Sequence, residues 1–127
     1  MEKTPGSRVW YFPDGELPEP GNFKAKGHES VIILNTTDEP ADCRLTLYFT
    51  DREPEEISDI QVAARRVRCI RTNSPEDLHG YRIPCGVQYA MRWQSSVPVI
   101  MMYGRLDTTD QPMHFYINQG FSEPTHE

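Results

Sequence analysis

The sequence lacks a sustained helical period, which argues against a helical bundle. It also lacks an apolar run close to the roughly 20 residues of a membrane-spanning helix, and its first residues lack the apolar core of a signal peptide. We therefore expect a soluble, cytoplasmic protein. Its cysteines, Cys43, Cys69 and Cys85, are odd in number and widely spaced, so we expect reduced thiols and not a disulfide framework or a Cys-x-x-Cys metal knuckle.

An excess of basic residues is also missing. Lys and Arg number 13 against 19 Asp and Glu, and the net charge of -6 repels phosphate backbones, so nucleic acid is an unlikely partner. A local basic patch remains a candidate for binding an anion or a partner, since Arg65, Arg66, Arg68 and Arg71 lie on or beside one expected strand. The competing interpretation is a solvated or interface-paired strand face.

Motifs of catalysis and cofactor binding are absent as well. There is no Gly-x-Ser-x-Gly elbow, no Walker sequence and no Gly-x-Gly-x-x-Gly loop. His28, His79 and His114 show neither His-x-His nor His-x-x-x-His spacing, so they do not predict a metal site. The sequence therefore predicts no enzyme, no cofactor and no metal.

What the sequence does contain is alternation with a period of two. Apolar residues alternate with polar ones at 43–50 and again at 87–94, which is typical of strands with one buried face. Further strands are expected at 8–12, 28–35, 57–63, 67–72, 99–103 and 113–121, with breaks at 13–21 and 95–98. About eight strands predict an all-β, antiparallel β-sandwich, jelly-roll-like, forming one domain over 1–121 with a flexible tail at 122–127.

Polar side chains gather at the ends of these strands. His28 and Glu29 are adjacent on one strand, so their side chains leave opposite faces and cannot readily act as an acid/base pair. Arg105 and Asp107 lie two residues apart on one face, where they can bind each other or a polyhydroxy ligand. A pair that stabilises the turn is the competing interpretation.

The ordered segments resemble the sensory rhodopsin transducer family. They are Trp10, His28-Glu29, Ile33-Leu34-Asn35, the run from Tyr48 to Pro54, Ala64-Arg65-Arg66, Ile83-Pro84, the run from Ser96 to Val99, and Arg105-Leu106-Asp107. The resemblance implies a small soluble β-sandwich that assembles as a homotetramer. It further implies signalling or small-molecule binding, with sugars as proposed ligands and a membrane rhodopsin or DNA as partners.

The positions that match the family are where a shared pocket or interface is expected. We expect a small polar ligand, such as a sugar, at Trp10, His28, Glu29, Asn35, Arg105 and Asp107. We expect a partner or an anion at Asp51, Arg65, Arg66 and Arg68. The leading hypothesis is a sensory binding module. The alternatives are a transducer for a membrane rhodopsin or a DNA-associated regulator, and, third, an enzyme that uses His28 and Glu29.

Overall fold

The computed structural model describes residues 4–21, 26–109, 114–118 and 120–123, and all regular structure in these ranges is β-strand. No helix that could span a membrane occurs in the same ranges. All strand pairs are antiparallel. The strands are β1 Ser7–Glu16, β2 His28–Asn35, β3 Ala41–Phe49, β4 Glu55–Val62, β5 Arg66–Arg71, β6 Gln88–Asp107, β7 His114–Asn118 and β8 Phe121–Ser122.

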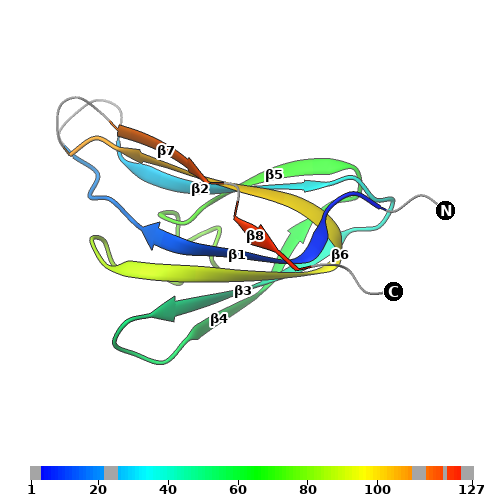
Figure 1. The fold of residues 1–127 in the computed structure, drawn as a ribbon, viewed down its shortest axis with the longest axis horizontal. Coiled ribbons are helices and arrows are strands. Elements are labelled where there is room, and N and C mark those ends of the chain that lie inside the picture. Colours follow the sequence, from blue (N-terminus) through cyan, green and yellow to red (C-terminus); the bar gives the residue numbers. More distant parts are fainter. Residues whose placement is uncertain (1–3, 22–25, 110–113, 119, 124–127) are drawn as a thin grey trace.

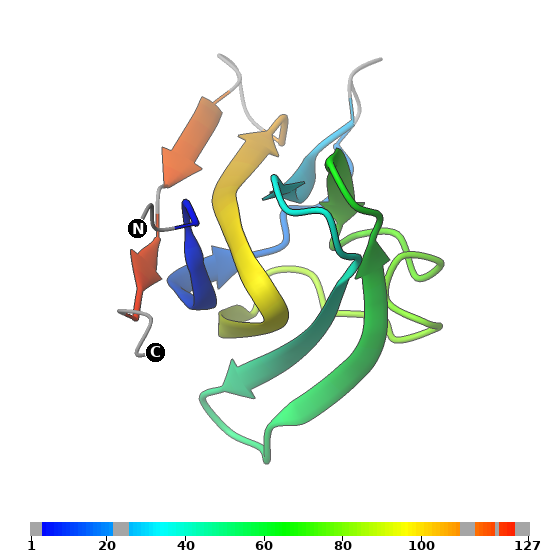
Figure 2. The same ribbon diagram turned by 90° about the vertical axis from the view of Figure 1, so that its right-hand side faces the viewer.

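The strands form two layers that share β6 (Figures 1 and 2). The first half of β6 pairs with β1 and β3, and its second half pairs with β2 and β7. One layer therefore runs β4-β3-β6-β1-β8 and the other β5-β2-β6-β7. The expected all-β antiparallel sandwich is confirmed.

The expected break at 95–98 is wrong and the one at 13–21 begins later than expected, because in both places the chain continues as strand through a proline. β6 runs without interruption for 20 residues, through the segment 95–98 that was expected to separate two strands. Its pairing with β3 ends at Ser95 and its pairing with β2 begins at Ile100. Pro98 thus lies where β6 changes layers, and its missing N–H costs no bond to β2 or β3. Likewise β1 extends to Glu16, and Pro13 falls in a register shift between Phe12 and Gly15.

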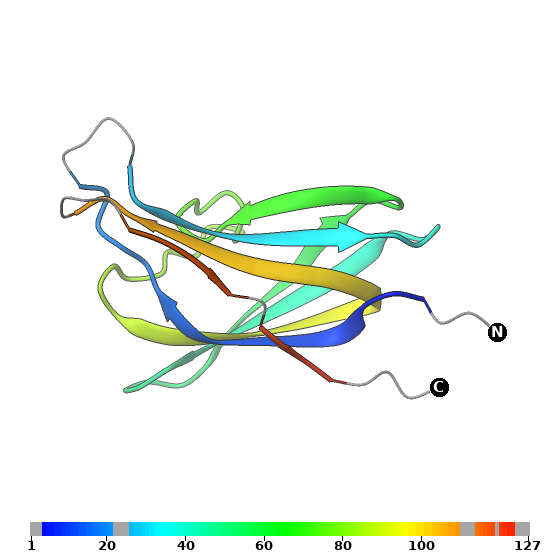
Figure 3. The ribbon, with the colours of Figure 1, turned by 45° about the horizontal axis from the view of Figure 1, so that its top comes forward.

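The last expected strand, 113–121, is divided in two. β7 pairs with the end of β6, whereas β8 pairs with β1 in the other layer (Figure 3). Ser122 belongs to β8, and the amide of Glu123 donates to the carbonyl of Val9 at 3.1 Å. The sheet therefore reaches two residues into the segment predicted to be a tail, while residues 113, 119 and 124–127 lie outside the described residues.

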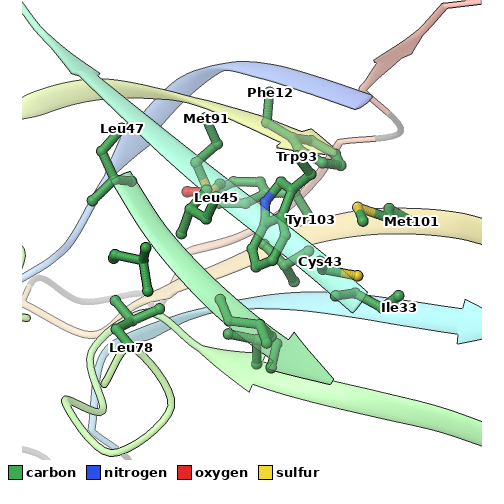
Figure 4. Packing of buried hydrophobic residues seen from close by; sticks show 14 of the residues in the cluster. Phe12, Ile33, Cys43, Leu45, Leu47, Leu78, Met91, Trp93, Met101 and Tyr103 are labelled. Carbon is green, nitrogen blue, oxygen red and sulfur yellow. The ribbon is translucent and has the colours of Figure 1, made fainter. Parts of the chain in front are cut away.

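The core fills the space between the layers with the inward residues of the alternating strands (Figure 4). Trp93, Tyr89 and Tyr103 from β6 are its largest buried side chains, packed with residues such as Leu45 and Leu47 of β3. The alternation expected at 43–50 and 87–94 is thus confirmed. Cys43, Cys69 and Cys85 are free thiols, and only Cys43 is buried.

Candidate functional site: a buried glutamate beside a loop pocket

The second residue of β2, Glu29, is completely buried. The strand alternation that turns Val31 and Ile33 into the core also turns this carboxylate inward. A buried carboxylate is costly unless its oxygens receive hydrogen bonds. The contacts of Glu29 are therefore the first place to look for a site.

Donors from four parts of the chain meet at the two oxygens of Glu29. Oε1 accepts from the hydroxyls of Thr72 at 2.8 Å and Tyr89 at 2.5 Å. Oε2 accepts from the amide of Glu16 at 3.0 Å and from the hydroxyl of Tyr103. We call these five residues the Glu29 network. Both oxygens are satisfied, and the network joins β1, β2, the end of β5 and both halves of β6.

The two phenols of the network stay protonated over a wide pH range. Burial, followed by the negative charge of Glu29, raises the pKa of Tyr89 well above its ordinary value. The same two causes, in the same order, raise the pKa of Tyr103. Both side chains can therefore serve as persistent hydrogen-bond donors to the carboxylate.

A pocket of about 270 Å³ adjoins the network. Loops that precede β2, follow β1 and follow β5 form its walls, and backbone bonds from Gly27 to Pro20 and from Gly86 to Leu17 tie these loops together. Thr72 belongs both to the pocket wall and to the Glu29 network. The lining residues are Leu17, Pro18, Pro20, Lys26, Gly27, Thr72, Asn73, Pro75, Arg82, Ile83 and Cys85.

The chain was compared with known proteins and structures. The family model described as "Anabaena sensory rhodopsin transducer" matches residues 5–121. The chain belongs to this transducer family. Among curated proteins, none matches the chain.

Two solved structures are similar to this chain in sequence and fold. The crystal structure of Thermotoga maritima 1070 has 31% sequence identity and a TM-score of 0.83, covering 94% of this chain and 97% of that one. The Anabaena sensory rhodopsin transducer has 33% identity and a TM-score of 0.67, covering 80% of this chain and 91% of that one.

Some of the residues predicted to bind a ligand lie near the network. Arg105 is the cross-strand partner of Glu29, and its guanidinium donates to the carbonyl of Glu16 at 3.4 Å. Its charge also lies 4.8 Å from the centre of the Tyr116 ring. Strand register therefore brings Glu29 and Arg105 to the same place.

His28 and Asp107 lie beside this pair without joining the network. His28 faces the opposite side of the sheet, and its Nδ1 lies 3.0 Å from the carbonyl oxygen of Lys26. Asp107 accepts from the hydroxyl and the amide of Thr109, and these bonds lower the pKa of its carboxyl group. Within the described chain, no three His, Cys, Asp or Glu residues form a cluster suited to a metal ion.

Two other predicted ligand-binding residues, Trp10 and Asn35, lie outside the pocket lining. The indole of Trp10 donates to the carbonyls of Ser7 and Val99 at 3.1 and 2.9 Å and packs against the core. Asn35 is fully buried at the other end of β2, about 20 Å along the strand from Glu29. Its carboxamide nitrogen donates to the carbonyl oxygens of Glu39, Val62 and Ala63 at 2.8 to 3.3 Å.

The four positions expected to bind a partner or an anion make local contacts. Asp51 pairs with Arg52 at 3.0 Å in the turn after β3, at the other end of β4 from Arg65. Arg65 pairs with Asp38 at 3.4 Å, and Arg66 donates to the carbonyl of Arg65. Arg68 lies 3.8 Å from Asp77 and donates to the carbonyl of Gln61 at 2.7 Å.

Sequence reasoning missed Thr72, Tyr89 and Tyr103 as members of the site. Tyr89 was expected on the buried face of its strand, and Tyr103 within a central apolar strand. A signal was present, because a glutamate on an inward position needs donors and buried tyrosines need acceptors. Which strands cross at Glu29 depended on the pairing of β2 with β6, which periodicity does not encode.

Proposed function

We propose that this member of the transducer family is a soluble, cytoplasmic sensory module that binds a small polar ligand, such as a sugar, in the loop pocket. The observation that carries the proposal is that Thr72 lines the pocket while its hydroxyl donates to the buried Glu29. Thr72 is only 1% exposed, so a ligand would reach it at the inner wall of the pocket, where a hydroxyl that donates one bond still has lone pairs to accept another. A pocket of about 270 Å³ suits a small molecule.

The network offers a route from the pocket to the strands. A ligand bond to Thr72 competes for the orientation of its hydroxyl and so changes one of the four donors to Glu29. Tyr89 and Tyr103 sit on the two halves of β6, which belong to different layers. Occupancy of the pocket therefore biases contacts in both layers. The proposal involves no turnover.

Calorimetric titration and thermal-shift screening against sugars and other polar metabolites test this function. The wild-type protein is expected to bind at least one of them, and Thr72→Val is expected to weaken that binding about tenfold, the equivalent of one hydrogen bond of about 1.4 kcal/mol. Asp38→Asn, outside the pocket, is the matched control. A folded protein whose melting temperature no compound raises would rule out the pocket proposal.

A second candidate function is protein interaction, as transducer for a membrane rhodopsin or as a DNA-associated regulator. Arg66 favours it, because this exposed side chain has no carboxylate partner among the described residues. Binding of the purified chain to a sensory rhodopsin in detergent should weaken on Arg66→Glu. Binding to DNA should fall steeply with salt. Undetectable or salt-independent binding would remove the respective partner.

We also infer that the chain associates with itself, as the homotetramer that the family resemblance implies. The exposed apolar side chains of the β5-β2-β6-β7 layer support this inference, since large apolar patches are rare on monomers. Light scattering coupled to size-exclusion chromatography measures the mass directly. A monomeric mass at all accessible concentrations would refute it.

A further inference from the structure

The loop pocket differs from the molecule as a whole in the sign of its charge. Of the described residues that line it, Lys26 and Arg82 are charged, and none is Asp or Glu. The whole chain, in contrast, carries a net charge of -6. Two other pockets, of about 290 Å³ each, follow this acidic balance, because each is lined by at least two of the carboxylates of Asp42, Glu55, Glu56 and Asp59. The loop pocket is therefore locally cationic on an acidic protein.

Both cations of the pocket are available to a ligand. Arg82 is exposed, and its guanidinium has no hydrogen-bond or ion-pair partner among the described residues. The ammonium group of Lys26 donates to the carbonyl of Gly21 at 2.9 Å and keeps further N–H groups for other acceptors. A guanidinium can bind two oxygens of a carboxylate or a phosphate at once. These side chains therefore suit an oxyanion.

The buried wall of the pocket offers a ligand different contacts. Thr72 is 1% exposed, and the apolar side chains of Leu17 and Ile83 are each 4% exposed. No aromatic side chain occurs among the described lining residues, so a sugar ring finds no flat aromatic face to pack on. A neutral sugar is thus left with few strong contacts here, whereas an anion gains charge-assisted hydrogen bonds, which are about twice as strong as neutral ones.

Negative charge lies behind this buried wall. Glu29 accepts the hydrogen bond of the Thr72 hydroxyl at 2.8 Å. Burial, followed by the charges of Glu19 and Glu29, raises the pKa of the Cys85 thiol, which also lines the pocket. An anionic group is therefore disfavoured at this wall and favoured beside the two exposed cations. Ligand hydroxyls suit the wall, because they are neutral and can donate to Thr72.

We propose that the ligand of the loop pocket is an anionic polyol, a sugar derivative that carries a carboxylate or a phosphate. This inference rests on the proposed binding function and names its ligand class. The guanidinium of Arg82 binds the oxyanion, Lys26 is a second donor, and a hydroxyl of the sugar donates to Thr72. The anion supplies most of the affinity, because hydrogen bonds to charged groups contribute more than neutral ones.

Calorimetric titration of the full chain with matched compounds tests this ligand class. The compounds are glucose, galactose and mannose, with the uronate and the 6-phosphate of each. The tightest binder should be a charged derivative that binds at least tenfold more tightly than its neutral parent, because the two differ in the anionic group. Whether it is a uronate or a phosphate identifies the anion. Inorganic phosphate and acetate, which lack the sugar hydroxyls, should bind at least tenfold more weakly.

Substitution of the free arginine places the anion in the pocket. Arg82→Gln should weaken binding of the tightest charged compound at least tenfold and leave the affinity of its neutral parent unchanged. Arg66→Gln is the matched control, because Arg66 is also exposed and lacks a carboxylate partner among the described residues, but lies outside the pocket lining. It should keep the wild-type affinity. Both variants should keep the wild-type melting temperature, since surface substitutions change stability little.

The outcomes separate this inference from the proposed function on which it rests. A neutral sugar that binds as tightly as its charged derivatives, and is weakened by Thr72→Val but not by Arg82→Gln, overturns the anionic class and leaves the pocket function intact. Charged derivatives that bind Arg82→Gln as tightly as wild type overturn the assigned contact. Inorganic phosphate that binds as tightly as a sugar phosphate overturns the polyol. A folded protein that binds no compound overturns both the inference and the proposed function.

Discussion

The two ends of β2 each bury one polar side chain completely, yet the two are bound in different ways. Asn35 bonds mainly to the backbone: its carboxamide donates to the carbonyls of Glu39 and Val62 and accepts from the amide of Thr37. Glu29 receives three of its four bonds from side-chain hydroxyls that come from other strands or their ends. The polar group at the Asn35 end therefore bonds mostly to adjacent turns, whereas the one at the Glu29 end bonds to residues far apart in the chain.

This difference separates a structural polar group from a candidate site. The carboxamide of Asn35 replaces backbone partners that the turns would otherwise leave unsatisfied, and it carries no charge. Glu29 is an ionisable group in an apolar core, and it accepts a hydrogen bond from Thr72, a residue of the pocket wall. Burial of a polar residue alone does not indicate function, whereas burial beside a cavity with side-chain partners does.

Removal of the carboxylate should have the largest effect. Glu29→Leu leaves the hydroxyls of Thr72, Tyr89 and Tyr103 without their acceptor, so the free energy of unfolding should fall by about 4 kcal/mol or more. Urea denaturation followed by fluorescence measures the loss. A loss of this size can unfold a domain whose total stability is about 5–15 kcal/mol.

A combined variant keeps that prediction testable. This variant adds Thr72→Val, Tyr89→Phe and Tyr103→Phe to Glu29→Leu, so the three unpaired hydroxyls are removed together with their acceptor. Replacing both partners of a hydrogen bond by apolar groups of similar shape changes stability little. The combined variant should therefore recover most of the stability but bind no ligand. A Glu29→Leu protein as stable as wild type would show that the network stabilises nothing.

Asn35→Ala should have an intermediate effect at the opposite end of β2. The substitution leaves backbone carbonyls such as those of Glu39 and Val62 without their hydrogen-bond donor, so the free energy of unfolding should fall by about 1–3 kcal/mol. Thermal and urea unfolding measure it. Because the pocket lies at the other end, any ligand that the wild type binds should bind this variant with the same affinity. A changed affinity would contradict the separation of the two ends.

The sequence allowed the fold to be predicted further than the site. Alternation placed Leu45, Tyr89 and Trp93 correctly in the core, because a strand with one buried face has apolar residues at every second position. It missed the continuity of β6 through Pro98, because a strand that changes layers needs no donor there. It also missed the partners of Glu29, because their approach depends on register between strands far apart in the chain.

The pH dependence of stability sharpens the contrast by isolating one phenol of the network. The pKa of Tyr103 is raised in the folded protein, mainly by burial, whereas the same phenol in the unfolded chain has a pKa of about 10. Above pH 10 the unfolded state thus binds fewer protons, and stability falls as pH rises. Tyr103→Phe removes this loss, so its slope should be shallower by up to about 1.4 kcal/mol per pH unit. Urea unfolding of both proteins at pH 8, 10 and 11 tests this, and parallel curves would contradict it.

The smallest effect is expected for a charge at the Asn35 end. Asp38 pairs with Arg65 at 3.4 Å, and both side chains are highly exposed, so Asp38→Asn should change the free energy of unfolding by less than about 1 kcal/mol. Asp38 and Glu29 thus differ in their partners and in their exposure to water, and of these two carboxylates only Glu29 joins several strands. High salt should abolish the small effect of Asp38→Asn and leave that of Glu29→Leu unchanged. If salt weakened both effects equally, water would reach Glu29 and the contrast between the two ends would fail.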